Sequence, residues 1–423
     1  MTFDQIQEKL NRIENDSTLQ NLIAQANARY ILYNTAESVD NFPKYTIKDD
    51  KLNLLAFHYL NLGCRFIENE HIKNGMFPLE KGASILENIH GSPEVKTNLG
   101  NYYGLISALS YYVCFQYSKA FILIKKIEND TVISKIISLF ISRNYQELQS
   151  IINSMIVNEV YNDDYLSENK EEIDSSKNIY EITIAKSLNN FIKYFYTGEK
   201  YLLELAKTNL KNLKIITEIK NEPDVWWVVR LLIIITDGIS EASLWNSLDK
   251  YFDTSDGLAR KYIHSLTYQK YGGIYELFIT QRNSLPKVIS EENNGCVVSI
   301  PTSSGKTRIA EIAILDSISK YKGSKALYIA PFRSLAYEIE NSLDEIFHNI
   351  GISVSHLYGG SLFSKLDEKV IDESDVIIAT PEKAKAMLRG NNEILNQIKL
   401  VVIDEGHLLG ANKRLIVNEI FYE

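Results

Sequence analysis

The chain has 423 residues, which is too long for one ordinary hydrophobic core, so we expect two or more domains. Hydrophobic residues make up 45% of it and charged residues 23%, which is typical of a soluble globular protein and excludes disorder over most of the length. The formal net charge of −9 excludes a generally basic nucleic-acid-binding protein, but it is compatible with a local groove that binds a phosphate backbone.

Cysteine usage and the N-terminal sequence indicate a reducing compartment. The three cysteines are far apart and form no CxxC pair, which argues against a disulfide framework or a zinc site. Residues 1–15 intersperse acidic and basic side chains and contain no apolar segment typical of a signal peptide. The longest apolar run, residues 225–235, is interrupted by Arg230 and is too short to span a bilayer. We therefore expect a cytoplasmic protein with no membrane partner.

Residues 1–270 show apolar side chains at the spacing of amphipathic helices, and they contain few prolines. The clearest expected helices are residues 104–127, 131–156, 180–197, 201–216 and 224–235. This pattern predicts an all-helical domain of helical hairpins, similar to a TPR or HEAT array. No fixed period is visible, so a true repeat and an irregular helical array both stay open. The polar, acidic segment 158–177 is predicted to be a loop.

Aromatic residues are abundant in this helical half, for example Tyr102-Tyr103, Tyr111-Tyr112 and Tyr194-Phe195-Tyr196. Aromatic side chains near lysines can stack on bases, but at helical spacing we expect them in the core. Trp226 and Trp227 are likewise expected to pack between helices. Helical arrays commonly present a concave face to another protein, so the sequence predicts a partner-binding or regulatory domain.

Residues 271–423 show a different pattern, in which short β-branched runs alternate with helical stretches. The expected strands are residues 296–300, 326–330, 353–357, 376–379 and 400–403, and the expected helices include 307–320, 334–349 and 382–389. Apolar strands alternating with helices predict an α/β domain with a parallel sheet covered on both faces. Ligands in that architecture bind at the carboxyl ends of the strands.

The first expected strand of this half leads into the sequence Pro-Thr-Ser-Ser-Gly-Lys-Thr. Exposed backbone N–H groups at a strand-to-helix turn form a cradle for an anion. In such a loop Gly305 allows close backbone approach, Lys306 offers a cation to the β- and γ-phosphates, and the Thr307 hydroxyl can bind Mg²⁺. The residues expected to contact the nucleotide here are Thr302, Ser303, Ser304, Gly305, Lys306 and Thr307. Ile300 stands where the general Walker pattern has glycine, so a polar loop that merely contains Gly-Lys-Thr is the alternative.

The last expected strand delivers two adjacent carboxylates to its carboxyl end. Asp404 can hold Mg²⁺, because hard cations prefer oxygen ligands, and Glu405 can orient and deprotonate an attacking water. An acidic pair in a solvated turn is the alternative, and the pairing with Lys306 at the end of a neighbouring strand favours the catalytic interpretation. His407, two residues after Glu405, is expected to couple the site to the rest of the protein, with an ordinary surface histidine as the alternative.

These two segments resemble motifs I and II of superfamily 2 DExH-box helicases, especially the Ski2-like group. Members of that group also lack the first Walker glycine, which would account for Ile300. The resemblance implies that residues 271–423 form a RecA-like first motor lobe of a P-loop NTPase, with ATP and Mg²⁺ as cofactors. It does not extend to residues 1–270.

Two further segments fall in the order that the resemblance requires. Gln281 lies in a segment similar to the Q motif, in which its amide would bind the adenine edge, and a helix-surface glutamine is the alternative. Pro331 and Arg333 lie in a segment similar to motif Ia, which contacts the nucleic-acid backbone. A surface arginine in a salt bridge is the alternative for Arg333.

The remaining motif-like segments would also contact nucleic acid. Thr380 and Pro381 lie in a segment similar to motif Ib, where a hydroxyl and a helix N-terminus face a phosphate. A plain helix start with proline in its first turn is the alternative. Gly359 and Gly360 resemble the glycine pair that lets the backbone approach the same strand, and a bare turn is the alternative.

The resemblance implies an ATP-dependent helicase or translocase that moves along or unwinds nucleic acid, with DNA favoured over RNA. The sequence ends soon after motif II, and the family's motif III and second lobe with its arginine fingers lie outside it. We therefore expect an N-terminal portion of a longer enzyme, which by itself binds ATP weakly and hydrolyses little of it, because the second lobe supplies charge to the transition state.

Long helicases with an N-terminal helical region and this form of motif II occur in bacterial antiphage defence systems such as Hachiman, in which a helicase partners a nuclease. A housekeeping DNA-repair or RNA-processing helicase is the alternative within the same class of enzyme. From a different class, the chain could be a non-catalytic binding module that docks a protein partner, for example a nuclease, through residues 1–270.

Overall fold

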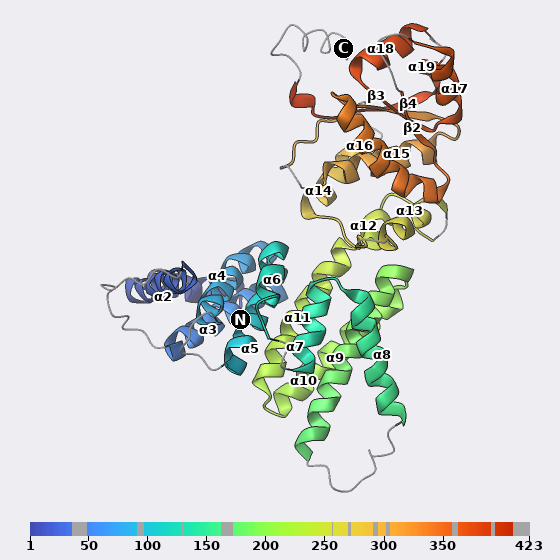
Figure 1. The fold of residues 1–423 in the computed structure, drawn as a ribbon. Helices are drawn as coiled ribbons and strands as arrows, with labels where there is room; N and C mark the ends of the chain where they lie inside the picture. The colour runs from blue at the N-terminus through green and yellow to red at the C-terminus, as the bar shows by residue number, and fades with distance from the viewer. Residues whose placement is uncertain are drawn as a thin grey trace. The chain divides into compact units, whose positions relative to one another are not determined.

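The computed structural model divides the chain into two compact units, Met1–Ser240 and Glu241–Glu423, whose elements Figure 1 labels. The first unit is helical, and the second contains a parallel sheet with helices. The structure describes residues 1–35, 49–90, 97–128, 131–161, 172–255, 257–269, 272–290, 295–301, 305–357, 363–390 and 394–408. An all-helical unit that precedes an α/β unit is the predicted fold class, and it is confirmed.

The helical unit consists of hairpins formed by helices that are neighbours in the sequence: α3 packs on α4, α4 on α5, and α9 on α10. Short connections between amphipathic helices favour this arrangement. The helices of this unit are α1 (Phe3–Glu14), α2 (Ser17–Thr35), α3 (Asp49–Glu68), α4 (Ile72–His90), α5 (Thr97–Val113), α6 (Tyr117–Ile124), α7 (Val132–Ile141), α8 (Tyr145–Tyr161), α9 (Glu172–Thr197), α10 (Lys200–Ile219) and α11 (Pro223–Ala242).

Two predicted helices are each divided into two shorter ones. The prediction of one helix over residues 104–127 is wrong, because α5 ends at Val113 and α6 begins at Tyr117. The same holds for residues 131–156, which form α7 and α8. In each break a non-glycine residue takes a left-handed conformation, Phe115 with φ 60° and Arg143 with φ 57°, which a continuous α-helix cannot accommodate.

The predicted loop over residues 158–177 is wrong at both ends. Helix α8 continues to Tyr161 and α9 already begins at Glu172, while residues 162–171 lie outside the described part of the chain.

The aromatic residues of the helical unit lie mainly in its core, as predicted. Tyr111, Tyr194 and Phe195 are fully buried, and Tyr103 is nearly so. Trp227 of α11 packs its ring against Phe57 of α3, with 5.2 Å between the ring centroids. These side chains therefore stabilise helix packing.

Three glycines allow α3 and α4 to approach closely. A Cβ atom added to Gly63 would lie 2.9 Å from the carbonyl oxygen of Gly75, and one added to Gly75 would lie 2.7 Å from that of Gly63. A Cβ atom on Gly82 would lie 2.9 Å from the carbonyl oxygen of Ala56. Backbone atoms cannot rotate away as a flexible side chain can, so the spacing of this hairpin requires the absence of side chains here.

The sheet-containing unit has four described strands, all parallel, in the order β2-β3-β1-β4. The strands are β1 (Lys325–Ile329), β2 (Val354–His356), β3 (Val376–Ala379) and β4 (Ile398–Ile403). The helices are α12 (Leu244–Leu248), α13 (Gly257–Thr267), α14 (Ile279–Val288), α15 (Lys306–Lys320), α16 (Arg333–Phe347), α17 (Lys365–Glu373), α18 (Pro381–Gly390) and α19 (Ile394–Gln397), with 3₁₀ turns η2 (His348–Ile350) and η3 (Gly406–Leu408). Four of the five predicted strands are thereby confirmed.

The fifth predicted strand, residues 296–300, is wrong. Residues 295–300 have no regular structure, and the side chain of Val297 is 97% exposed. Strand β4 is an edge of the described sheet, with Val401 49% exposed and Ile403 39% exposed. A strand forms only where a partner satisfies its backbone hydrogen-bonding groups, and no described strand pairs with residues 296–300.

Helix α13 belongs to the sheet-containing unit. The sequence pattern changes near residue 270, but the boundary between the two compact units lies earlier in the chain, after Ser240. The hydroxyl of Tyr262 donates to Glu311 of α15 at 2.8 Å, and Glu311 also pairs with Arg308. Ser265 donates to the carbonyl oxygen of Ile346 in α16 at 2.9 Å. No described helix of either unit is long and apolar enough to cross a bilayer.

Because α3 and α4 are in close contact, two glycine-to-alanine substitutions should change the free energy of unfolding by different amounts. Gly63→Ala should lower the free energy of unfolding by about 1–3 kcal/mol, because the new methyl group overlaps backbone of α4. Gly238→Ala is the control, since its Cβ would meet nothing within 4 Å and should stabilise α11 by up to about 1 kcal/mol. Thermal denaturation of both variants measures the difference, and equal stabilities would contradict the close packing.

Candidate functional site

The described residues at the start of α15 suit an anion-binding site. Gly305 adopts a left-handed conformation with φ 73° and precedes the first helical residue, Lys306. A Cβ atom at Gly305 would collide with the amide of Gln281, so this position requires glycine. The unpaired N–H groups of the first turn and the helix dipole both favour negative charge at this end of α15.

Gln281 of α14 supports this turn directly. Its side-chain nitrogen donates to the carbonyl oxygen of Gly305 at 3.0 Å, and its side-chain oxygen accepts from the backbone N–H of Phe278 at 2.8 Å. The side chain is buried. Gln281 therefore lies beside the loop, and one of its amide hydrogens remains for a further acceptor.

Some predicted site residues lie outside the described residues. These are Thr302, Ser303 and Ser304 of the phosphate loop and the glycine pair Gly359-Gly360. Lys306 and Thr307 are the first two residues of α15, and both are half-buried.

The carboxylate of Asp404 is held in place by neighbours on both sides. Its backbone N–H donates to the carbonyl oxygen of Ile329 at 3.0 Å, which extends the pairing of β4 with β1. One side-chain oxygen accepts from the hydroxyl of Tyr328 at 2.8 Å, and the other accepts from the backbone N–H of Glu405 at 2.8 Å. A carboxylate fixed in this way suits a metal ligand, because its orientation is set before a cation binds.

Glu405 follows in a strained conformation, and His407 lies in the short turn η3. The φ angle of Glu405 is 51°, a left-handed value that non-glycine residues rarely adopt. Strain of this kind persists where surrounding contacts enforce it, and it is common at functional sites.

Tyr328 is a site residue that motif reasoning missed. Burial and then the charge of Asp404 raise the pKa of Tyr328 well above its usual value, so the hydroxyl keeps its proton and donates to Asp404. The sequence did contain a signal, because Tyr328 is the one hydroxyl in the apolar part of its strand. A buried hydroxyl requires a partner, although the sequence does not say which.

The sheet register places the carboxyl ends of β1, β3 and β4 side by side. Ile329 of β1 pairs with Ala379 on one side and with Ile403 on the other. The residues that follow, among them Thr380 and Asp404, therefore lie in one row at the carboxyl ends of the strands.

Helix α15 runs back along this sheet. It ends at Lys320, the chain enters β1 at Lys325, and α15 packs on both β1 and β4. A helix joined to the next strand by so short a turn must run antiparallel to it, so the first turn of α15 faces the edge where β1 and β4 end. An ammonium group, a hydroxyl and a carboxylate at such an edge are the donors that a magnesium–phosphate group needs.

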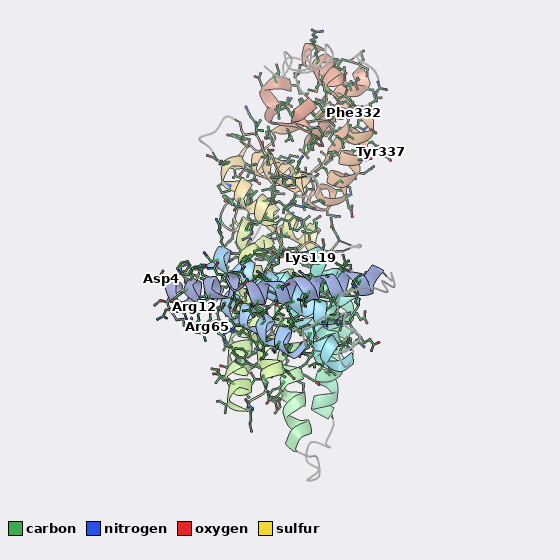
Figure 2. The ribbon with its side chains drawn as sticks, turned by 90° about the vertical axis from the view of Figure 1, so that its left-hand side faces the viewer. Asp4, Arg12, Arg65, Lys119, Phe332 and Tyr337 are labelled. Atoms are coloured by element: carbon green, nitrogen blue, oxygen red, sulfur yellow. The ribbon has the colours of Figure 1, made fainter. Side chains whose placement is uncertain are left out.

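The first predicted nucleic-acid contact is exposed. Arg333 begins α16, its side chain is exposed, and it forms no ion pair with any residue that the structure describes. Pro331, two residues earlier, is half-buried. Phe332 and Tyr337 are 57% and 55% exposed, and Figure 2 shows both side chains. The salt-bridge alternative for Arg333 therefore has no support among the described residues.

The second predicted contact begins a helix. The hydroxyl of Thr380 accepts from the backbone N–H of Lys383 at 3.4 Å, and Pro381 is the first residue of α18. Lys383 is buried and donates to Asp367 of α17 at 2.8 Å. Burial alone would raise the pKa of Asp367, but hydrogen bonds from Lys383 and Ser364 outweigh it and lower the pKa. Lys383 thus stabilises the fold.

Comparison with known proteins identifies the sheet-containing part. Residues 279–421 match the DEAD/DEAH box helicase family. These residues form a DEAD/DEAH box helicase domain. The match begins at the first residue of α14 and includes both the Gly305 turn and Asp404.

Individual relatives extend this similarity to different lengths. The chain is 40% identical over 414 residues to the Hachiman protein HamB of Bacillus cereus, a match that covers 97% of this chain and 36% of that protein. It is 38% identical over 142 residues to the ATP-dependent DNA helicase Hel308 of Pyrococcus abyssi, covering 34% of this chain and 19% of that protein. The chain thus spans little more than a third of the length of HamB, and the match to HamB includes the helical unit.

Removal of the Tyr328 hydroxyl tests whether Asp404 is a metal ligand. Tyr328→Phe keeps the ring but leaves one oxygen of Asp404 without its donor. We expect the Mg²⁺-dependent part of nucleotide affinity to fall about 10–100-fold, as for other groups that orient a metal ligand. Titration of nucleotide with and without Mg²⁺ measures it, and Tyr337→Phe on exposed α16 is the control. A loss of similar size without Mg²⁺ would contradict this role.

Breaking the Lys383–Asp367 pair should destabilise the fold. Lys383→Met leaves a buried carboxylate unpaired and should cost about 3–5 kcal/mol, and adding Asp367→Asn should restore much of it. The lowered pKa of Asp367 means that the pair stabilises the protein above about pH 4, and that this contribution is lost as the pH falls through the folded-state pKa. Denaturation of the three proteins between pH 7 and pH 3 tests both statements, and a constant difference would contradict them.

Proposed function

We propose that the complete protein is an ATP-dependent nucleic-acid motor and that residues 271–423 contain its ATP-binding lobe. The observation that carries this proposal is the common edge at which the first turn of α15 and the carboxyl end of β4 lie. Anion-binding N–H groups and a fixed carboxylate at one sheet edge suit a nucleoside triphosphate with its metal ion. The helicase domain match supports the same class of activity.

Each residue has a distinct role in the proposed reaction. Lys306 neutralises charge on the β- and γ-phosphates, while Thr307 and Asp404 would hold Mg²⁺. The bound Mg²⁺ would neutralise charge on the phosphate oxygens. Glu405 accepts a proton from the attacking water and orients it, and His407 couples this end of β4 to the rest of the protein.

The amide of Gln281 would contact the adenine edge with its remaining hydrogen while it keeps its bond to Gly305. This arrangement makes the phosphate loop sensitive to the presence of the base. A nucleotide without adenine would leave the amide with its present partners only, so adenine nucleotides should bind more tightly than inorganic triphosphate.

Nucleic acid is proposed to bind at the same sheet edge. Exposed Arg333 follows β1, which pairs with β4, and α18 begins after Thr380 at the end of β3, on the other side of β1. An arginine and a helix N-terminus suit phosphate oxygens, which position a strand without reading its sequence. DNA is favoured over RNA, because Hel308 is named a DNA helicase.

A role in antiphage defence with a protein partner is part of the proposal. The similarity to HamB extends over both units, and HamB is named as a Hachiman protein. Bacteria that carry the complete gene and its neighbours should survive phage infection better than bacteria in which Lys306 is replaced by Ala.

Substitution of Glu405 should separate ATP binding from hydrolysis. In the complete protein Glu405→Gln should lower kcat about 10³-fold and leave ATP affinity nearly unchanged, because the amide cannot accept the proton of water. Lys306→Ala should instead weaken ATP binding. Steady-state ATPase assays with DNA or RNA, and filter binding of ATP, measure the two effects.

The matched control is Glu338→Gln, an exposed carboxylate of α16. It changes the net charge by the same amount and should leave kcat unchanged. Wild-type turnover in Glu405→Gln would show that another group is the base.

A further inference from the structure

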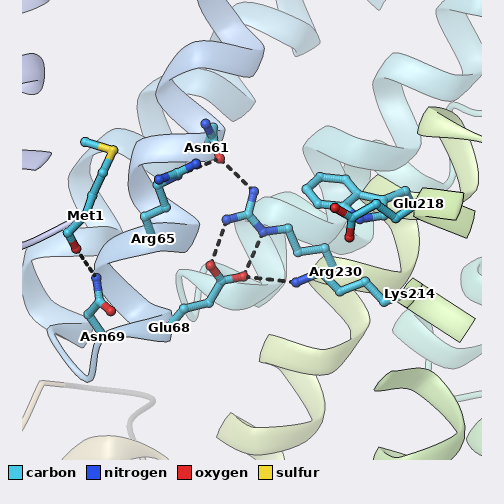
Figure 3. A pocket seen from close by; sticks show the side chains of 9 residues that line it. Met1, Asn61, Arg65, Glu68, Asn69, Lys214, Glu218 and Arg230 are labelled. Carbon is cyan, nitrogen blue, oxygen red and sulfur yellow. Dashed lines mark hydrogen bonds and ion pairs between the residues drawn. The ribbon is translucent and has the colours of Figure 1, made fainter. Parts of the chain in front are cut away.

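A polar cavity of about 320 Å³ lies within the helical unit, apart from every residue assigned above. Helices α3, α10 and α11 line it, together with Met1, and Figure 3 shows its side chains. A cavity of this size is in the range that holds small ligands. Its walls are rich in charged groups, which distinguishes it from a packing defect between helices.

The centre of the cavity wall is a fixed ion pair. Arg230 of α11 is 4% exposed, and its Nε and Nη2 donate to the two carboxylate oxygens of Glu68 in α3, each at 2.8 Å. Its Nη1 donates to Asn61 at 2.8 Å. This bidentate pair is electrically neutral as a unit, so Glu68 has little charge left to balance other cations.

Two further cations lie around this pair without full compensation. Arg65 of α3 donates only its Nε, to Asn61 at 3.4 Å, and its terminal nitrogens have no acceptor among the described residues. Lys214 of α10 forms an ion pair with Glu68 at 3.7 Å, but it shares that carboxylate with Arg230, so one negative charge faces two cations. Figure 3 shows these side chains around Glu68. The cavity therefore has an excess of positive charge close to Glu68.

The remaining helix contributes an indole. The indole Nε1 of Trp226 in α11 is buried and has no hydrogen-bond partner in the described structure. Trp226 also lines the cavity, so its indole can report a ligand that binds there. The amino group of Lys214 lies 5.4 Å from the centre of the same ring.

We propose that this cavity binds a phosphate monoester. Arg65 and Lys214 offer donors from two helices beside the indole of Trp226, and a phosphate offers three acceptor oxygens and between one and two negative charges at neutral pH. A carboxylate offers two oxygens and one charge and satisfies fewer of these donors. The guanidinium fork of Arg65 also matches the geometry of a phosphate.

One carboxylate in the lining opposes this ligand. Glu218 of α10 is exposed and forms no ion pair with a described residue. Its charge repels a phosphate, so removing it should strengthen binding. A cluster that served only helix packing would show no such dependence of ligand affinity on Glu218.

The indole signal of Trp226 provides a local test. The chain contains three tryptophans, so nitrogen-15 labelling of indoles gives few signals, and Trp226→Phe assigns the relevant one. Inorganic phosphate is titrated through the millimolar range at constant ionic strength. The protein carries Lys306→Ala, so the phosphate loop of the other unit does not respond, and any tag is C-terminal because Met1 lines the cavity. We expect a saturable shift of the Trp226 signal.

Variants that remove single charges then test whether each side chain strengthens or weakens phosphate binding. Arg65→Gln and Lys214→Gln should each weaken phosphate binding about tenfold or more, because a hydrogen bond to a charged group is lost. Glu218→Gln should tighten it. Lys211→Gln removes an exposed charge from the same helix outside the cavity and should have no effect. An unchanged affinity in Arg65→Gln would overturn the proposal.

The source of the phosphate is distinguished by separate ligands. A nucleoside 5′-monophosphate is compared with a single-stranded oligonucleotide that carries a 5′-phosphate and with its 5′-hydroxyl form. Tighter binding of the mononucleotide identifies a small ligand, and dependence on the 5′-phosphate of the oligonucleotide identifies a strand end. Equal effects of acetate, or no saturable shift with any phosphate, would overturn the proposal. Because every readout is at Trp226, failure here leaves the proposed motor function untouched.

Discussion

The candidate site depends on the parallel pairing of β1 with both β3 and β4. Ile329 is the common partner of Ala379 and Ile403, so three segments that are far apart in the sequence end in one row. A slip of β4 by one residue would turn the side chain of Asp404 to the other face of the sheet, because side chains alternate along a strand. The bond from Tyr328 to Asp404 exists only in this register. Backbone pairing between strands therefore fixes the chemistry at their ends.

The sequence predicts the elements of this sheet well, because strands buried on both faces are continuous apolar runs. The predicted bounds of β3 coincide with the observed ones, and the start of α15 differs by one residue. Residues 296–300 are also largely apolar and β-branched, but they form no strand. A strand needs a neighbouring strand to pair with, and its own residues do not specify that partner. The breaks at Phe115 and Arg143 escaped prediction for a related reason: a left-handed residue that is not glycine leaves no mark in the sequence.

Site residues can be predicted where one short segment contains all the chemical groups. They cannot be predicted where the groups meet only through the packing of separate elements. A glycine, a lysine and a threonine at the start of a helix suggest an anion cradle by themselves, and an acidic pair after an apolar strand suggests a metal site. The contact of Gln281 with Gly305, by contrast, joins residues from two elements, and no pattern within either segment shows it. Lys383 lies in the segment similar to motif Ib, yet its ammonium group is buried against Asp367 and stabilises the fold.

The net charge says little about where this protein can bind anions, because some of its cationic side chains are in ion pairs and others are not. Lys383 and Arg230 are each paired with a carboxylate, whereas Arg333 is exposed and Arg65 faces a cavity. The first turn of α15 offers backbone N–H groups and faces the same end of the sheet as Asp404, so in the proposed site an anion would need a cation to offset the carboxylate, which a metal-bound phosphate would provide. The cavity of the helical unit offers side-chain cations around a carboxylate that is already neutralised. An anion would need no metal there, and this difference in local compensation makes the two proposed phosphate sites chemically distinct.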